Sequence, residues 1–340
     1  MGKNHTMKTN RRSFLKTMAA GIAATSLPDL SAHPGLLKLN IPAREGTSVM
    51  GLTCEPLKTV RIGMVGLGMR GMDSLQRLLK VDGVEITAVC DIMHAECAYI
   101  HDLRWLKFNK KDGYWNMWRL QYSKWHTGNL YPTHGLGPVA QIMKINRGDR
   151  MEYLTSMSSN QVGMSLYARE KFGADSPEAR QNYRLGDMNT TLVQTFDGKT
   201  IMIQHDTTSP RPYSRIHLLS GTKGIAQKWP RQQVALEPNA HQWLKKEDFD
   251  TLMAQYEHPI SREIGEKAKQ VGGHGGMDFI MDYRLIYCLR NGLPLDQDVY
   301  DAATWSSIVE LSEISVKNHS SAVEVPDFTR GAWETGKPWG

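Results

Sequence analysis

The chain has 340 residues, enough for about two domains, and its apolar share of 40% and charged share of 22% are those of an ordinary globular protein. The formal net charge of +6 is concentrated at the start, and the chain has no RNP-like or zinc-finger motif, so nucleic-acid binding is disfavoured. The four widely spaced cysteines form no CxxC pair, which argues against a disulfide scaffold or structural zinc, and nothing after residue 30 is apolar for long enough to span a bilayer.

The first 34 residues have the pattern of an export signal. Residues 10–16 read Asn-Arg-Arg-Ser-Phe-Leu-Lys, a twin-arginine pattern, and a mildly apolar stretch follows at 17–24. This route carries proteins that fold first, often around a tightly held cofactor. We therefore expect residues 1–34 to be a signal peptide, residues 35–57 a linker, and the protein to be exported, to the periplasm. The alternative is a basic amphipathic start with no export role.

Residues 58–93 have the pattern of a dinucleotide-binding unit. A strand is expected at 60–65, a helix at 74–79 and a second strand at 84–90, with a GxGxxG sequence between the first two. The glycines would allow a tight turn and close approach to a pyrophosphate at the helix N-terminus. A carboxylate about 20 positions on would bind the ribose diol, favouring NAD over NADP. The residues assigned to the cofactor are Gly66, Gly68, Met69, Arg70, Gly71 and Asp91. A glycine-rich structural turn is the alternative.

This nucleotide domain is incomplete. A domain of its class needs about six parallel strands, but Asp91 is followed almost at once by residues 94–100, which alternate as antiparallel strands do. One βαβ unit cannot form a sheet that is buried on both faces. The fold class is therefore α/β plus α+β: an incomplete Rossmann-type domain at 58–93, then an open, mainly antiparallel sheet with helices on one side at 94–335.

The second domain contains several predicted elements. An Asp-Gly turn at 197–198 predicts a hairpin, and Gly-Thr-Lys-Gly at 221–224 predicts another. Residues 105–130 are rich in Trp and Tyr and are expected to form a long surface loop. Helices are expected at 137–145, with Pro138 near the first turn, at 278–291 and at 300–317.

Five segments carry a family resemblance. They are residues 66–71, 98–104 (Ala-Tyr-Ile-His-Asp-Leu-Arg), 129–138 (Asn-Leu-Tyr-Pro-Thr-His-Gly-Leu-Gly-Pro), 209–213 (Ser-Pro-Arg-Pro-Tyr) and 273–278 (Gly-His-Gly-Gly-Met-Asp). The chain resembles the oxidoreductase superfamily typified by glucose–fructose oxidoreductase and inositol dehydrogenase. Within it, the chain is most similar to glycosyl hydrolase family 109, the NAD-dependent α-N-acetylgalactosaminidases. The block at 131–138 is highly specific to that family.

The chain departs from the family at one place. Family members have roughly a hundred more residues between the positions that match Ile92 and His94, a length that suits the missing αβ units. That stretch should complete the nucleotide domain. The chain therefore looks like a family member with an internal deletion.

The resemblance implies a glycosidase that differs from those with two carboxylates at the scissile bond. Bound NAD supplies reversible oxidation of a sugar hydroxyl, so that the neighbouring C–H becomes acidic, the aglycone is eliminated and water adds. The implied catalytic residues are His134, Tyr131 and Tyr213. The implied substrate contacts are Arg119, Tyr131, Pro132, Thr133, His134, Tyr213 and Tyr99, and Tyr131 also faces the nicotinamide.

Each of these residues also has a structural interpretation. Without the resemblance, a single histidine in a loop such as His134 more often has a structural role. Tyr213 could cap the end of a strand through its hydroxyl, and Tyr99 could be an ordinary core residue. Arg119 alone would be a solvated charge. His101 and Asp102 lack metal-site spacing, so no metal is expected, and His274 is expected to shape the pocket rather than react.

Three functional hypotheses remain open from the sequence. The first is the NAD-dependent glycosidase, the second an NAD-dependent sugar dehydrogenase, and the third a non-catalytic remnant that keeps only the sugar site. The expected partner is a glycan or glycoconjugate, with no nucleic acid and no membrane span. A homo-oligomer formed through the sheet domain is a further option.

Overall fold

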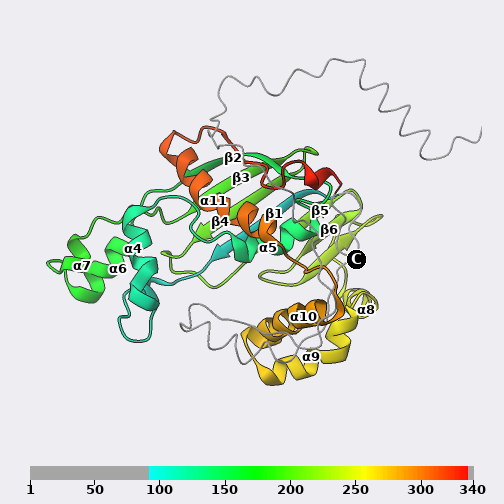
Figure 1. Cartoon of the computed structure of the whole chain (residues 1–340). Helices are drawn as coiled ribbons and strands as arrows, with labels where there is room; N and C mark the ends of the chain where they lie inside the picture. The colour runs from blue at the N-terminus through cyan, green and yellow to red at the C-terminus, as the bar shows by residue number, and fades with distance from the viewer. Residues whose placement is uncertain (1–91, 336–340) are drawn as a thin grey trace, which may run out of the picture. The chain divides into compact units, whose positions relative to one another are not determined.

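The structure is a computed structural model that describes residues 92–335, so the predicted signal peptide, linker and nearly all of the predicted nucleotide domain lie outside the described residues. Within this range one sheet has the strand order β7-β6-β5-β1-β4-β3-β2-β8. Its strands are β1 (Ile92–Ile100), β2 (Met151–Ser158), β3 (Asn189–Thr195), β4 (Thr200–Asp206), β5 (Leu218–Gly221), β6 (Gly224–Gln227), β7 (Gln233–Leu236) and β8 (Val323–Glu324). Figure 1 shows the strands side by side.

The helices form three groups. Across the sheet lie α5 (Thr133–Ile142) and α11 (Val299–Lys317), while α8 (Lys246–Gln255), α9 (Pro259–Val271) and α10 (Met277–Asn291) form a separate group. Near one end of the sheet lie α3 (Arg104–Lys107), α4 (Trp118–Trp125), α6 (Gly163–Phe172) and α7 (Pro177–Arg180). Three short 3-10 turns complete the list: η2 (Trp115–Met117), η3 (His274–Gly276) and η4 (Ala332–Glu334).

The main core lies between one face of the sheet and the helices α5 and α11. Ala95 and Cys97 of β1 and Ile201 and Ile203 of β4 pack there against Leu136, Val139, Trp305 and Ile308. The opposite face is open, since Leu192 is 50% exposed and Met157 is 66% exposed. The predicted sheet with helices on one side is therefore confirmed.

The start of α11 and the loop after α5 are held together by charged side chains. Helix α11 begins with a capping box in which Asp298 and Asp301 exchange side-chain and backbone bonds. The buried Arg147 then donates to both carboxyl oxygens of Asp301, at 2.7 and 2.6 Å. Because this pair is bidentate, it holds the loop after α5 firmly against the start of α11.

Several predicted elements are confirmed. The Asp-Gly turn joins β3 to β4, with Gly198 at φ 81°, and the second hairpin joins β5 to β6. The helices predicted at 278–291 and 300–317 are α10 and α11.

Three expectations were wrong in detail. The strand at 94–100 begins at Ile92, and it pairs antiparallel with β5 but parallel with β4, so it joins the two halves of the sheet. The region 105–130 is not a continuous loop, because α3, η2 and α4 lie within it. The helix expected at 137–145 begins at Thr133, so Pro138 is inside it rather than in its first turn.

No helix among residues 92–335 is both long and apolar enough to cross a membrane.

Candidate active site

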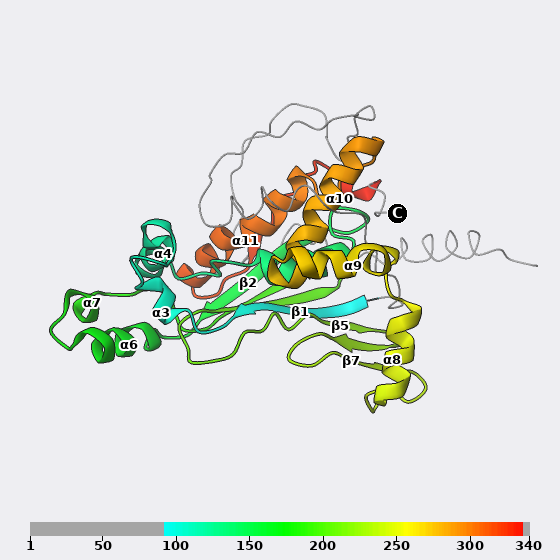
Figure 2. The same cartoon turned by 90° about the horizontal axis from the view of Figure 1, so that it is seen from below.

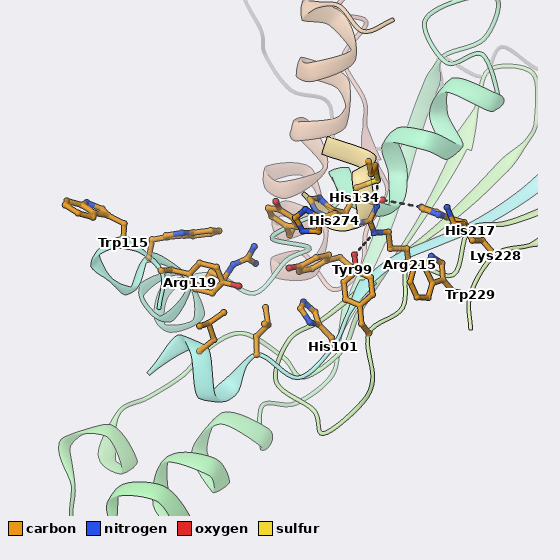
Figure 3. Close-up of a pocket in the computed structure, with 17 residues that line it drawn as sticks. Tyr99, His101, Trp115, Arg119, His134, Arg215, His217, Lys228, Trp229 and His274 are labelled. Carbon is orange, nitrogen blue, oxygen red and sulfur yellow. Dashed lines mark hydrogen bonds between the residues drawn. The ribbon is translucent and has the colours of Figure 1, made fainter. Parts of the chain in front are cut away.

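A cavity of about 830 Å³ lies where the end of β1 meets the start of α5 (Figure 3). Its volume is in the range of small-molecule sites, about 300–1,000 Å³. Its wall is aromatic and cationic, and no Asp or Glu of the described chain lines it. The lining residues are Tyr99, His101, Leu103, Leu106, Tyr114, Trp115, Trp118, Arg119, Tyr131, His134, Tyr213, Arg215, His217, Lys228, Trp229, His274 and Met277.

Gly135 allows α5 to lie directly on β1. A Cβ at this position would be 2.6 Å from the Ala98 nitrogen and 2.7 Å from the Ala98 oxygen, so only glycine fits. This contact sets Tyr131 and His134 beside Tyr99, with ring centroids 4.6 and 5.3 Å from that of Tyr99. The predicted pair from the 131–134 block therefore does face one pocket.

Tyr213 reaches the same place from a different segment. The chain turns after β4 because Asp206 accepts from the backbone N–H groups of Thr208 and Ser209, at 2.9 and 3.0 Å. It then runs back along β1, where the Ser214 N–H donates to the Ile100 carbonyl at 2.9 Å. The Tyr213 ring thus lies 4.9 Å from His101.

Arg119 is a buried cation surrounded by aromatic rings. It is 8% exposed, and its guanidinium carbon lies 4.4 Å from the ring centre of Tyr131, 4.5 Å from that of Trp118 and 4.6 Å from that of Tyr114. Cation–π attraction offsets part of the cost of burying this charge. Its Nε has no hydrogen-bond partner. Since an unpaired buried donor is costly, the site is built to receive an acceptor from a ligand.

Burial keeps two of the histidines in the site neutral. Burial, reinforced by Arg119, lowers the pKa of His101 to about 4, and burial lowers the pKa of His217 to about 4. Burial raises the pKa of Tyr99 well above its usual range, although the charge of Arg119 acts in the opposite direction. At neutral pH these three groups can therefore exchange hydrogen bonds with a ligand without carrying charge.

The opposite wall carries residues that the sequence analysis missed. They follow β4 and β6: Arg215, His217, Lys228 and Trp229. Arg215 Nε donates to the Tyr213 hydroxyl, and burial lowers the pKa of Lys228. The spacing of Arg215 and His217, two residues apart before a strand, only weakly indicated that both face one side. Their place in the pocket becomes clear only from the structure, in which this segment runs back along β1.

His274 also lines the cavity, as predicted. It lies in a run of left-handed residues, between Gly273 at φ 78° and Gly275 at φ 70°, and has φ 47° itself. Its Nδ1 is 2.8 Å from Asp278 Oδ2, so the carboxylate fixes the ring orientation.

The remaining residues singled out from the sequence do not line the cavity or lie outside the described residues. Thr133 begins α5, Pro132 caps it, and neither is among the lining residues; the Pro132 carbonyl accepts from Leu136 N–H at 2.9 Å. Asp102, for which no metal role is expected, accepts two hydrogen bonds from the Arg104 side chain, at 3.0 and 2.7 Å. The cofactor residues from Gly66 to Asp91 lie outside the described range, so among the cofactor predictions only Tyr131 is placed.

The cavity wall thus combines flat aromatic rings, the guanidinium of Arg119 and the two neutral imidazoles of His101 and His217. Residues 76–335 match the C-terminal domain of glycosyl hydrolase 109. This chain therefore belongs to glycosyl hydrolase family 109, and the resemblance found from its sequence is confirmed.

Two relatives show how much of the family's length is present. An alpha-N-acetylgalactosaminidase of Bacteroides fragilis is 59% identical over 246 residues, which is 72% of this chain and 58% of the relative. The chain thus spans less than two thirds of that protein. A glycosyl hydrolase family 109 protein of Shewanella pealeana is 38% identical over an alignment of 463 positions, covering 98% of this chain and 99% of the relative. Since the chain has 340 residues, more than a hundred aligned positions have no residue here.

Weaker similarities are found to two solved structures. A levoglucosan dehydrogenase in complex with NADH is 15% identical, covers 70% of this chain and 59% of its own, and has a TM-score of 0.47. An inositol dehydrogenase homolog of Azotobacter vinelandii complexed with NAD+ is 16% identical, covers 69% of this chain and 58% of its own, and has a TM-score of 0.45.

Proposed function

We propose that this chain is a glycosidase of the NAD-dependent type that acts on terminal α-N-acetylgalactosamine. The observation that carries the proposal is the convergence of Tyr131, His134 and Tyr213 with Tyr99 and Arg119 on one cavity, in a chain of this family. The name of the Bacteroides relative, at 59% identity, supports the choice of sugar.

The chemistry of the cavity wall suits an N-acetylated sugar. The rings of Tyr99 and Tyr131 offer flat faces for the C–H face of a pyranose, and the unpartnered Nε of Arg119 can donate to a hydroxyl or an acetamido carbonyl. A glycosidase with a carboxylate pair would need two acids near the bond to be cleaved. The described lining contains none, which favours the cofactor-dependent route.

The described part of the cavity is compatible with NAD. Its wall carries Arg119, Arg215 and Lys228 and no acid, so an anionic dinucleotide meets no like charge. Tyr131 would lie at the nicotinamide, and the residues from Gly66 to Asp91 predicted from the sequence would hold the phosphates and ribose. When bound, NAD supplies reversible oxidation of a sugar hydroxyl.

The protein residues would then move the protons. His134, whose ring lies 4.8 Å from that of Tyr131, would take the proton of the sugar hydroxyl. Tyr213 would exchange a proton at C2 or at the leaving oxygen, with its hydroxyl oriented by Arg215. Tyr99 and Arg119 would hold the sugar between them.

The experiment incubates the chain with nitrophenyl α-N-acetylgalactosaminide and NAD. Release of nitrophenol without net NADH supports the proposal, and the His134→Ala variant should lose it while the exposed His241→Ala control keeps it. Net NADH from free sugar, without nitrophenol release, would show a dehydrogenase instead.

The alignment with the Shewanella relative favours a second candidate, a sugar-binding chain without turnover. More than a hundred positions of that alignment have no residue here, a number that would suffice for the missing αβ units. In that case calorimetric titration gives weak or no NAD binding while N-acetylgalactosamine still binds. Stoichiometric NAD binding at micromolar affinity or tighter would exclude this candidate.

We also propose export by the twin-arginine route, supported by Arg11 and Arg12 in the pattern at 10–16. Replacing both arginines with lysine should retain the chain in the cytoplasm, as cell fractionation would show.

A further inference from the structure

Trp115 is both an exposed side chain and part of the cavity wall. It is 79% exposed, more than any other large apolar residue of the described chain. It also lines the cavity, at the outer end beyond Arg119 as seen from His134 (Figure 3). Because Trp115 is exposed and also part of the cavity wall, its indole offers a flat apolar face to a ligand.

The loop that carries Trp115 is firmly built. The Asn109 side chain accepts from the N–H groups of Lys111 and Asp112, at 3.0 and 2.9 Å. A Cβ at Gly113 would be 2.1 Å from the Asn109 carbonyl oxygen, so this turn requires glycine. The turn therefore fixes the backbone that leads to Trp115 before any ligand arrives, which lowers the entropic cost of binding.

The backbone after Trp115 is held in an unfavourable conformation. Asn116 and Met117 both have left-handed φ, at 50° and 49°. Such conformations are strained and persist where the surroundings impose them. Here Met117 packs against the cluster of Leu120 and Met164. Met117 is therefore packed in the cluster while Trp115, two residues earlier, stays exposed.

The aromatic side chains divide into an inner and an outer set. Tyr114 and Trp118 contact the Arg119 guanidinium at 4.6 and 4.5 Å, so they belong to the inner sugar site. Trp115 has no ring contact or cation–π contact of this kind in the described chain and continues the wall outward. The cavity volume of about 830 Å³ leaves room beyond one sugar ring.

Charge limits what can occupy the outer position. Arg119, Arg215 and Lys228 line the cavity and no acid does, so a cationic group is repelled. A neutral pyranose fits, because its C–H face stacks on an indole and its hydroxyls stay in water.

We propose that Trp115 forms a second sugar subsite, continuous with the cavity, that binds the pyranose ring linked to the anomeric oxygen of the N-acetylgalactosamine. This inference rests on the proposed function, since it takes the cavity to hold the terminal sugar. The preferred ligand is therefore an oligosaccharide rather than a simple glycoside.

The test compares two ligands by calorimetric titration of the full chain without added nucleotide. They are N-acetylgalactosamine and a disaccharide in which it is α-linked to galactose. The wild-type chain should bind the disaccharide about tenfold more tightly than the monosaccharide, a size expected for one aromatic stacking contact. Trp115→Ala should reduce this ratio to less than twofold, and Trp115→Phe should keep part of it.

Trp125→Ala is the matched control, since Trp125 is 65% exposed on the same segment and does not line the cavity. It should keep the tenfold ratio. The inference is overturned if the wild-type ratio is near one, if both Trp variants reduce it equally, or if Trp115→Ala changes the molecular mass in light scattering, which would make Trp115 a contact between copies. Failure of both ligands to bind would overturn the proposed function as well.

Discussion

His217 Nε2 lies 3.2 Å from the main-chain carbonyl oxygen of His134. That carbonyl is the one to which residue 138 would donate in a regular helix, but residue 138 is proline and has no N–H. The low pKa of His217, about 4, keeps its ring neutral, so the nitrogen facing the carbonyl carries the hydrogen that it donates. A proline inside α5 and a histidine before β5 thus jointly fix the turn that carries His134.

The first prediction is a double-mutant cycle on this pair. His217→Ala should lower the free energy of unfolding by about 0.5–1.5 kcal/mol, because it removes a hydrogen bond to the part-buried His134 carbonyl. In a Pro138→Ala background the helix regains its own donor, so the same substitution should cost clearly less. Urea denaturation of the four proteins measures the coupling. Equal costs in the two backgrounds would show that the bond does not compensate for Pro138.

The second prediction concerns the close contact between Gly135 and Ala98. Gly135→Ala should destabilise the chain by about 1–3 kcal/mol or more, because the added methyl meets backbone rather than a flexible side chain. It should also weaken N-acetylgalactosamine binding, since α5 must move and take Tyr131 with it. Gly265→Ala in α9 is the control: a Cβ there has nothing within 4 Å, so this change should stabilise by about 0.5–1 kcal/mol. If both variants lose stability to a similar extent, the close contact between Gly135 and Ala98 is not the cause of the destabilisation.

The sequence predicted the elements whose signals are local. The hairpin at Gly198 follows from its Asp-Gly turn, and α10 and α11 follow from helical periodicity. The region 105–130 was misassigned because its many aromatic residues hide the short helix α4, whose first turn is set by two left-handed residues that are not glycine. The start of α5 was placed too late because proline is usual in the first turn of a helix, whereas Pro138 lies in the sixth position of α5.

One wall of the site was predicted from the sequence and the opposite wall was not. The family resemblance named Tyr131, His134, Tyr213, Arg119 and Tyr99, and all five line one cavity. The opposite wall, from Arg215 to Trp229, depends on a segment that returns along β1. No local pattern in the sequence encodes that return.

The third prediction tests Arg119 as the donor to the sugar. Arg119→Met should weaken N-acetylgalactosamine binding by about 10- to 100-fold, the value of a hydrogen bond from a charged group. Arg119→Lys should recover little, because an ammonium group lacks the planar fork that lies against three rings. Arg169, exposed on α6, is the matched control. An Arg119→Met variant that binds as tightly as the wild-type chain would remove this residue from the site.

The fourth prediction follows from Lys107, which is 1% exposed and donates to the Ser123 hydroxyl at 3.0 Å. Burial first, then the charge of Arg119, lowers the pKa of Lys107 to about 7, although Asp206, Asp187 and Asp102 act in the opposite direction. In the unfolded chain its pKa is about 10.4. Between these values the unfolded chain binds one more proton than the folded chain, so this residue makes stability rise with pH, by at most about 1.4 kcal/mol per unit.

Urea denaturation at pH 7 and pH 9 measures this effect. The wild-type chain should gain stability over this interval relative to Lys107→Met, which cannot bind the proton in either state. Below pH 7 the difference should level off, because the amine is then charged in both states. The exposed Lys110→Met serves as control and should keep the wild-type dependence on pH. If wild type and Lys107→Met change in parallel from pH 7 to pH 9, Lys107 is charged in the folded protein throughout, and the buried amine must be paired more strongly than by Ser123 alone.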